Sequence, residues 1–168
     1  MKKNKSSKSW IINQHRDEYF KQSRSLGYRS RAAFKLLELN KKFNFLKKNS
    51  KVLDLGAAPG GWSQVVCNIC TKGKVMSVDL KQMTELKNIE FLMMDFRVNE
   101  SKKAIENFFG DKIDVILSDM AANTTGNKDL DCIRTNELCM EALKFSLNVL
   151  DNNGVILSKL FIGQDFEA

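Results

Sequence analysis

Short apolar runs that alternate with segments of helical periodicity restrict this chain to very few folds. The apolar runs lie at 51–56, 74–79, 89–95, 113–119 and 155–159. The segments of helical pattern lie at 31–43, 62–70, 101–109 and 134–150. This alternation predicts an α/β fold, a mostly parallel sheet with helices on both faces. A length of 168 residues without an internal repeat suits a single domain.

Local residues suggest where some of these elements begin. Ser30 is expected to cap the helix at 31–43, because a serine hydroxyl can accept a hydrogen bond from the first turn. Residues 121–130 are polar and predict a loop before the last helix. Asn152, Asn153 and Gly154 predict the turn that leads into the last strand.

Charged side chains stand where the predicted strands end. Ligands of parallel α/β sheets bind outside the carboxyl ends of the strands. The residues at those ends are Asp54, Asp79, Asp95, Asp119 and Lys159. Four acids in register at four strand ends are hard to attribute to helix capping alone, so we expect them to form a binding site.

The turn from Asp54 to Gly61 reads Asp-Leu-Gly-Ala-Ala-Pro-Gly-Gly, with Gly56 and Gly60 placed to let a ligand approach the backbone. It does not match the dinucleotide fingerprint, because Ala58 replaces the second required glycine. Asp54 would also repel a pyrophosphate, which argues against a NAD-dependent dehydrogenase. An acid here attracts a cationic ligand instead, and S-adenosylmethionine carries both a sulfonium and an ammonium group. Asp79 could then accept hydrogen bonds from ribose hydroxyls, and Asp95 from the adenine amine.

The net charge of +7 is concentrated at the start of the chain. Residues 1–48 carry fourteen basic and three acidic side chains, and the rest of the chain is mildly acidic. Such a basic front predicts contact with a polyanion, and a nucleic acid is favoured over a small anion. We therefore divide the single domain into a mobile tail at 1–9, a basic RNA-binding segment at 10–48 and a cofactor-binding core at 49–168. Within the basic segment, Trp10, Tyr19 and Tyr28 could stack on unpaired bases or pack against the sheet.

Cysteine content and hydropathy indicate the redox compartment, and they bear on metal binding and membrane association. The four irregularly spaced cysteines favour a reducing cytoplasm over a disulfide scaffold. Cys67 and Cys70 could be half of a zinc site, but a second pair is missing and His15 is the only histidine, so we expect no metal. No apolar stretch approaches the length of a membrane span, so we expect no membrane partner.

Four runs of sequence, in this order, resemble the FtsJ-type ribosomal RNA ribose 2′-O-methyltransferases. They are Tyr-Arg-Ser-Arg-Ala-Ala-Phe-Lys-Leu from Tyr28, Asp-Leu-Gly-Ala-Ala-Pro-Gly-Gly-Trp-Ser-Gln from Asp54, Leu-Ser-Asp-Met-Ala from Leu117, and Ser-Lys-Leu-Phe from Ser158. The likeness covers residues 10–166, and its Gly-Gly-Trp-Ser-Gln run is closer to the bacterial large-subunit branch than to the relatives that modify tRNA. It implies a Rossmann-like class I methyltransferase fold and a uridine of large-subunit ribosomal RNA as target. We expect the protein to be a monomer.

The resemblance also implies residue roles. Gly60, Trp62, Asp79, Asp95 and Asp119 would contact S-adenosylmethionine. Lys35, Asp119 and Lys159 would be three of the family's four catalytic residues, Lys-Asp-Lys-Glu.

The chemistry is consistent with those roles. A ribose 2′-hydroxyl is a poor nucleophile, so attack on a methyl group needs a base for its proton. We assign Lys159 as the base and Asp119 as its orienting partner. Lys35 would position the hydroxyl and, as a nearby cation, favour the deprotonated amine of Lys159.

Two departures from the family pattern leave an alternative open. Ala122 replaces a proline of the usual Ala-Pro-Asn loop. The sequence given also stops just after the fifth predicted strand, so the two further strands and the catalytic glutamate of the family are apparently missing. A catalytically impaired RNA-binding or ribosome-assembly protein that keeps the cofactor pocket is therefore an alternative, as is a tRNA ribose 2′-O-methyltransferase.

Overall fold

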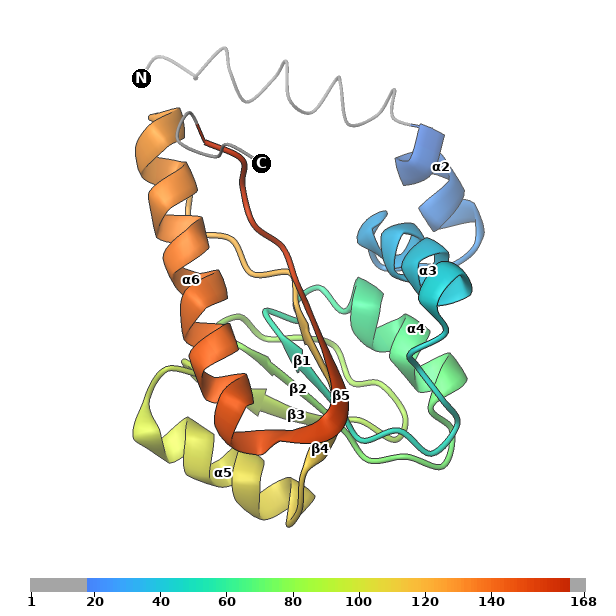
Figure 1. The fold of residues 1–168 in the computed structure, drawn as a ribbon. Coiled ribbons are helices and arrows are strands. Elements are labelled where there is room, and N and C mark those ends of the chain that lie inside the picture. Colours follow the sequence, from blue (N-terminus) through green and yellow to red (C-terminus); the bar gives the residue numbers. More distant parts are fainter. Residues whose placement is uncertain (1–17, 164–168) are drawn as a thin grey trace.

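The computed structural model describes residues 18–163, which form five strands and five helices (Figure 1). The strands are β1 (Val52–Leu55), β2 (Val75–Asp79), β3 (Glu90–Met93), β4 (Ile113–Ser118) and β5 (Leu150–Ser158). The helices are α2 (Glu18–Ser25), α3 (Ala32–Phe43), α4 (Gly61–Ile69), α5 (Asn99–Phe109) and α6 (Lys128–Val149). None of the helices in this part of the chain combines the length and apolar character needed to cross a bilayer.

The strands form one sheet in the order β3-β2-β1-β4-β5, and every neighbouring pair is parallel. Parallel strands need crossover connections, and the helices supply most of them. Because all strands point the same way, their carboxyl ends share one edge of the sheet. We call the side of the sheet where the strands end the carboxyl edge, and the side where they begin the amino edge; neither term refers to an outermost strand.

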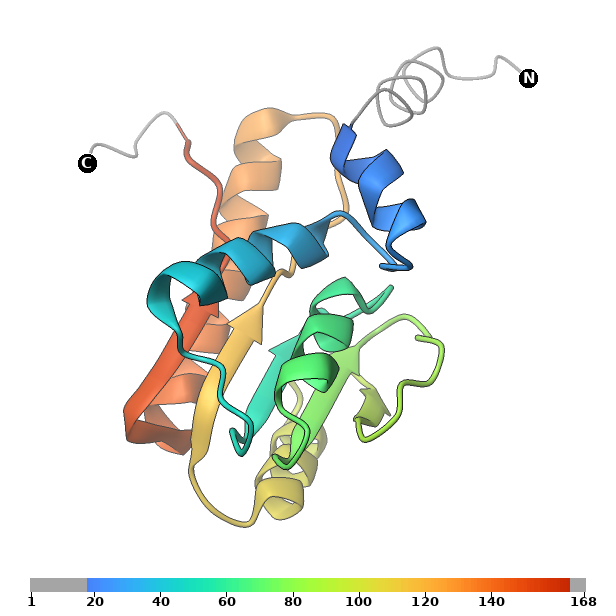
Figure 2. The same ribbon diagram turned by 90° about the vertical axis from the view of Figure 1, so that its right-hand side faces the viewer.

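Helices cover both faces of the sheet (Figures 1 and 2). On one face α3 and α4 pack over β1, β2 and β4, with Leu36 and Val66 fully buried between the layers. On the other face α5 and α6 cover the sheet, with Ile105 and Phe145 in that core. The predicted α/β class with a parallel sheet and helices on both faces is confirmed.

Two boundaries differ from the sequence-based prediction by more than two residues. Helix α6 begins at Lys128, within the predicted loop, because the Asn127 side chain accepts hydrogen bonds from the backbone N–H groups of Asp129 and Leu130. Strand β5 begins at Leu150 rather than after the predicted turn. It pairs there with Ile113, and the regular ladder resumes only where Val155 pairs with Val115. Residues 151–154 thus form an irregularity within the strand.

The prediction that Ser30 caps α3 is wrong. Arg31 occupies the N-cap position, and no side chain makes a capping hydrogen bond there. The Ser30 hydroxyl instead lies against Gly61, where a Cβ would collide with it. Close packing between two segments therefore decides the orientation of this serine.

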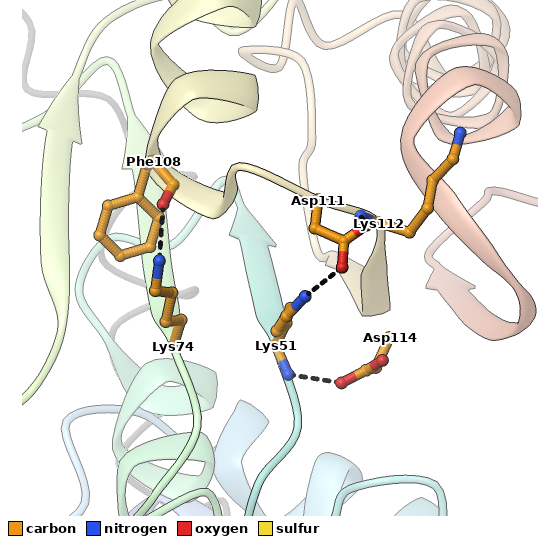
Figure 3. Close-up of polar contacts among 6 residues, drawn as sticks. All are labelled: Lys51, Lys74, Phe108, Asp111, Lys112 and Asp114. Atoms are coloured by element: carbon orange, nitrogen blue, oxygen red, sulfur yellow. Dashed lines mark hydrogen bonds and ion pairs between the residues drawn. The ribbon is translucent and has the colours of Figure 1, made fainter.

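Lysines at the amino edge form hydrogen bonds and ion pairs with neighbouring segments (Figure 3). The Lys74 ammonium donates to the Phe108 carbonyl in the last turn of α5, at 3.3 Å, and Lys112 donates to the Asn148 carbonyl in the last turn of α6, at 2.7 Å. Lys51 pairs with Asp111 at 3.1 Å. Carbonyls in a last helical turn lack helical partners, and cations are favourable there. These lysines therefore have structural partners away from the carboxyl edge.

Core packing gives a stability prediction. Leu53 in β1 is fully buried, so Leu53→Ala leaves a cavity and should lower the free energy of unfolding by about 2–5 kcal/mol. Leu147→Ala is the matched control, because Leu147 is 78% exposed and should change stability by less than about 0.5 kcal/mol. Urea denaturation of both variants measures the difference, and similar losses would contradict this view of the core.

Candidate functional site

The carboxyl edge holds a cavity of about 320 Å³. Its wall includes Asp79, the last residue of β2, together with Asp95 after β3 and Asp119 after β4. A neighbouring hollow of about 60 Å³ is lined by Asp54 and Trp62. Gly56, Ala58 and Asp119 line both spaces, so the two are adjacent. The structure thus gathers the acids of four strand ends around one region.

Gly56 permits the close approach of β1 and β4 at this edge. Its φ is +75°, and a Cβ here would lie 2.5 Å from the Met120 Cγ and 3.1 Å from the Met120 Cα. The backbone N–H of Gly56 donates to the Val78 carbonyl at 2.9 Å, which joins the turn to β2. Any other residue would push the turn away from the segment that carries Asp119.

Gly60 and Trp62 lie on the other side of the same turn. Gly60 has φ +107° and lines neither space; a Cβ there would lie 2.7 Å from Arg29 Nη1. Trp62 is 4% exposed, and its indole N–H donates to the Ala32 carbonyl at 2.8 Å. Gly60 therefore leaves room for Arg29, just before α3, and Trp62 bonds to the first residue of α3 while also lining the smaller hollow.

Asp54 is a buried carboxyl group with one unsatisfied oxygen. Its Oδ2 accepts a hydrogen bond of 2.6 Å from Ser63, whose hydroxyl also lies 2.9 Å from that of Ser77. Its Oδ1 is buried and has no partner among the described residues. Burial raises the pKa of Asp54 to about 7; the Ser63 bond opposes this shift, and the charges of Asp119 and Asp79 add to it. An unsatisfied buried oxygen of this kind suits a positively charged or hydrogen-bond-donating ligand group.

Asp79 orders the two loops beside the cavity. Its Oδ2 accepts from the backbone N–H of Ala58, and its Oδ1 from that of Lys81, both at 2.8 Å. Each carboxylate oxygen has a second lone pair, so Asp79 can also accept from a ligand hydroxyl.

Asp95 has a partner that the sequence analysis missed. The Arg97 guanidinium holds it in a two-pronged ion pair, with Nη2 2.6 Å from Oδ2 and Nε 3.0 Å from Oδ1. Hydrogen bonding from Arg97 lowers the pKa of the Asp95 carboxyl below its usual value. Arg97 also lines the cavity. The Asp-Phe-Arg spacing was the available clue, because residues two apart around a turn can pair.

Asp119 and Lys159 form the ion pair of the site. The Lys159 ammonium lies 2.8 Å from Asp119 Oδ1 and donates to the Asp119 main-chain carbonyl at the same distance. Both side chains are largely but not fully buried, with exposed fractions of 29% for Asp119 and 21% for Lys159. The pair results from the pairing of β4 with β5, since Ser118 and Ser158 are directly opposite each other.

The third predicted catalytic residue is not in this pair. Lys35 is exposed on α3 and, like Lys159, lines neither space; it makes no hydrogen bond or ion pair with Asp119 or Lys159 in the described structure. Its ammonium is therefore available to a ligand that approaches from the α3 side.

The cysteines are used in packing and hydrogen bonding. Cys67 donates to the Lys87 carbonyl at 2.9 Å, and Cys70 is buried in the core beneath α4. Burial raises the pKa of the Cys70 thiol to about 11, which opposes the thiolate form that a metal requires. Within residues 18–163, no three His, Cys, Asp or Glu side chains converge as a metal site would need; His15 lies outside this range.

Sequence comparison identifies the relatives of this fold and site. The FtsJ-like methyltransferase family matches residues 28–168, which include every strand of the sheet and every residue discussed at the carboxyl edge. The chain belongs to the FtsJ-like methyltransferase family. The resemblance inferred from its sequence runs is therefore confirmed.

Individual proteins that are similar to this chain support its membership of the family. A Pelagibacter ubique protein named ribosomal RNA large subunit methyltransferase E is 48% identical over 99% of this chain and 82% of its own length. Its namesake from Bradyrhizobium diazoefficiens is 44% identical over 95% of this chain and 72% of its own. A crystal structure of a Plasmodium falciparum protein described as a ribosomal RNA methyltransferase superposes with a TM-score of 0.74 at 34% identity, covering 82% of this chain and 80% of that one.

The pKa of Asp54 predicts a specific pH dependence of stability. A carboxyl whose folded pKa is about 7 instead of 3.8 keeps its proton in the folded state between those values. Stability from this group is thus complete below about pH 4 and is lost as the pH rises through about 7. Asp54→Asn removes that loss, so its free energy of unfolding relative to the wild type should rise with pH over this range, by up to about 4 kcal/mol.

Urea denaturation of both proteins at intervals from pH 4 to pH 8 measures this difference. Comparing the variant with the wild type cancels the other titrating groups. A difference that stays constant across the range would show that Asp54 titrates normally.

Proposed function

We propose that the chain methylates a ribose 2′-hydroxyl in large-subunit ribosomal RNA, with S-adenosylmethionine as methyl donor and a uridine as target. Membership of the FtsJ-like family and the names of its relatives support methylation of this RNA. The observation that carries the ribose assignment is the Lys159–Asp119 pair, because a hydroxyl nucleophile requires a positioned base and the Lys159 amine, oriented by Asp119, can supply one.

The residues of the carboxyl edge fit this cofactor. S-adenosylmethionine supplies an electrophilic methyl group on a sulfonium. The unsatisfied Oδ1 of Asp54 suits a cationic or donor group, and Asp79 has lone pairs for ribose hydroxyls. Asp95, kept ionised by Arg97, suits the adenine amine. In this assignment Gly56, Gly60, Trp62 and Asp119 complete the cofactor-binding set, with Gly60 and Trp62 acting by shaping the turn.

The contacts of Lys159 suggest how it acts as a base. An ammonium has three N–H bonds, and Asp119 accepts from the Lys159 ammonium through both its carboxylate and its main-chain oxygen. A neutral amine can keep both of these bonds and leave its lone pair in the third direction. In the proposed step this lone pair would take the proton of the 2′-hydroxyl as the new C–O bond forms and the methyl–sulfur bond of the donor breaks, with its electron pair remaining on the sulfur of a neutral thioether. Asp119 thereby orients the base without accepting the proton itself.

Lys35 is proposed to position the 2′-hydroxyl of the RNA, and the exposed basic side chains of the N-terminal segment to bind its phosphates. Lys21, Arg24 and Lys42 are exposed on α2 and α3, where they can neutralise phosphates. Tyr28 is less available for stacking, since its ring packs edge-on against Phe34 with centroids 5.6 Å apart. The tail at 1–9 and Trp10 lie outside the described residues, as does the side chain of Tyr19.

The same proposal includes the wider organisation of the protein. It would act as a monomer in the cytoplasm, with residues 10–48 as the RNA-binding segment and 49–168 as the cofactor-binding core. Helix α3 belongs to both parts, since Ala33 and Leu36 are buried against the sheet while Lys35 is exposed.

The test is methyl transfer to large-subunit ribosomal RNA isolated from cells that lack the protein. The full chain and labelled S-adenosylmethionine should create a site that resists alkaline hydrolysis, because 2′-O-methylation blocks cleavage at the adjacent phosphate. Lys159→Met should lower kcat at least about 100-fold, since it removes the base. The dissociation constant for S-adenosylmethionine should change less than about two-fold.

Lys144→Met is the matched control. Lys144 also pairs with a carboxylate, Glu141, at 3.0 Å, but it lies on the exposed face of α6. Its substitution should leave transfer unchanged. Cofactor binding without transfer to any ribosomal RNA would instead favour an RNA-binding or assembly protein, and label in tRNA alone would move the substrate to tRNA.

A further inference from the structure

The segment before α3 is fastened to the glycine turn by reciprocal hydrogen bonds. The Gln64 side chain in α4 accepts from the Arg29 backbone N–H at 2.7 Å and donates to the Gly27 carbonyl at 3.0 Å. Trp62 donates to the Ala32 carbonyl, as described above. The Gly-Gly-Trp-Ser-Gln run therefore holds the entry to α3 as well as forming one side of the cofactor turn.

The Arg29 side chain extends this attachment to a third segment. Its Nη1 donates to the Thr84 carbonyl at 2.7 Å and, at 3.4 Å, to that of Pro59. Its Nη2 donates to the Glu85 carbonyl at 2.9 Å. One guanidinium thus bridges the glycine turn and the loop between β2 and β3, which is the loop that follows Asp79.

The geometry around Gly60 shows that this bridge is built into the turn. A Cβ at Gly60 would lie 2.7 Å from Arg29 Nη1 and 2.9 Å from Met83 Sδ. Met83 is 2% exposed, so the β2–β3 loop is anchored at the same place. Gly60 leaves the space that the guanidinium occupies, which explains why this glycine faces Arg29 and not the cavity.

We propose that Arg29 is a positioning residue for the cofactor site and not a contact for RNA phosphates. Its position in the sequence, among the basic side chains of residues 10–48, suggests RNA binding. Its donors instead bind three backbone carbonyls in the two loops that Asp79 also joins, through Ala58 and Lys81. Arg29 fixes the distance between these loops, and with it the orientation of the Asp79 carboxylate toward the cavity. This role deepens the proposed function and rests on it.

Arg29→Met tests this role. Without the guanidinium the two loops lose their bridge, so the KM and the dissociation constant for S-adenosylmethionine should rise about ten-fold. The kcat at saturating cofactor should stay within about two-fold, because Lys159 and Asp119 are untouched. RNA affinity and its dependence on salt should remain those of the wild type, since no phosphate contact is lost. Arg29→Lys should recover only part of the cofactor affinity, because one ammonium cannot reproduce the fork.

Arg24→Met is the matched control, the same substitution five positions earlier. Arg24 is exposed on α2, with its guanidinium over the Phe20 ring, 5.4 Å from the centroid. This variant should weaken RNA binding and reduce its salt dependence while leaving the dissociation constant for S-adenosylmethionine, measured without RNA, unchanged.

Weaker RNA binding with unchanged cofactor affinity in Arg29→Met would overturn the inference. A fall in kcat without a change in KM would likewise exclude a positioning role at the cofactor site. If Arg29→Met does not fold, Arg29→Lys decides, because its cofactor KM must then lie above that of the wild type. If the wild type transfers no methyl group, the proposed function is refuted. The dissociation constant of Arg29→Met for S-adenosylmethionine would still test whether Arg29 positions the cofactor site.

Discussion

The parallel pairing of β1 with β2 and β4, and of β4 with β5, determines where the polar side chains of this protein meet. Leu55 lies beside Val78 and Ser118, and Ser118 lies beside Ser158, so these strands end at one level. Asp119 and Lys159 follow directly, and the Lys159 N–H continues the ladder to the Ser118 carbonyl at 2.8 Å. A shift of one residue between β4 and β5 would turn one of the two side chains to the other face of the sheet. The ion pair therefore depends on this register.

The two edges of the sheet use charge differently. At the amino edge, lysines bind helix ends and Asp111, so their charges have partners within the fold. At the carboxyl edge, Asp54 keeps an unsatisfied buried oxygen, and burial with the neighbouring acids holds its pKa near 7. A cationic ligand at the carboxyl edge would stabilise the ionised form of the buried Asp54 carboxyl. Preorganised charge of this kind is favourable for catalysis, because no further reorganisation is needed when the ligand binds.

Most of the fold followed from sequence patterns, because buried strands and amphipathic helices have distinct periods. The errors had one tertiary source and one local source. Ser30 has the chemistry of a cap but packs against Gly61, and Asn127 extends α6 into a segment whose composition is typical of a loop. For the site, the rule that ligands bind at strand ends correctly brought Asp79, Asp95 and Asp119 to one cavity. It could not show Arg97 on Asp95 or Arg29 across two loops, because these contacts depend on side-chain directions in loops. It also could not show that Lys35 on α3 makes no contact with the Asp119–Lys159 pair, because that depends on how the helix is placed over the sheet.

Coupling between Asp119 and Lys159 is the central claim, and a double-mutant cycle measures it most directly. The kcat for methyl transfer to ribosomal RNA would be determined at saturating S-adenosylmethionine for Asp119→Asn, Lys159→Met and the double variant. If Asp119 acts only by orienting the Lys159 amine, the double variant should be about as slow as Lys159→Met alone. Losses that multiply in the double variant would show that the two residues act independently, and would contradict the ion pair as the catalytic unit.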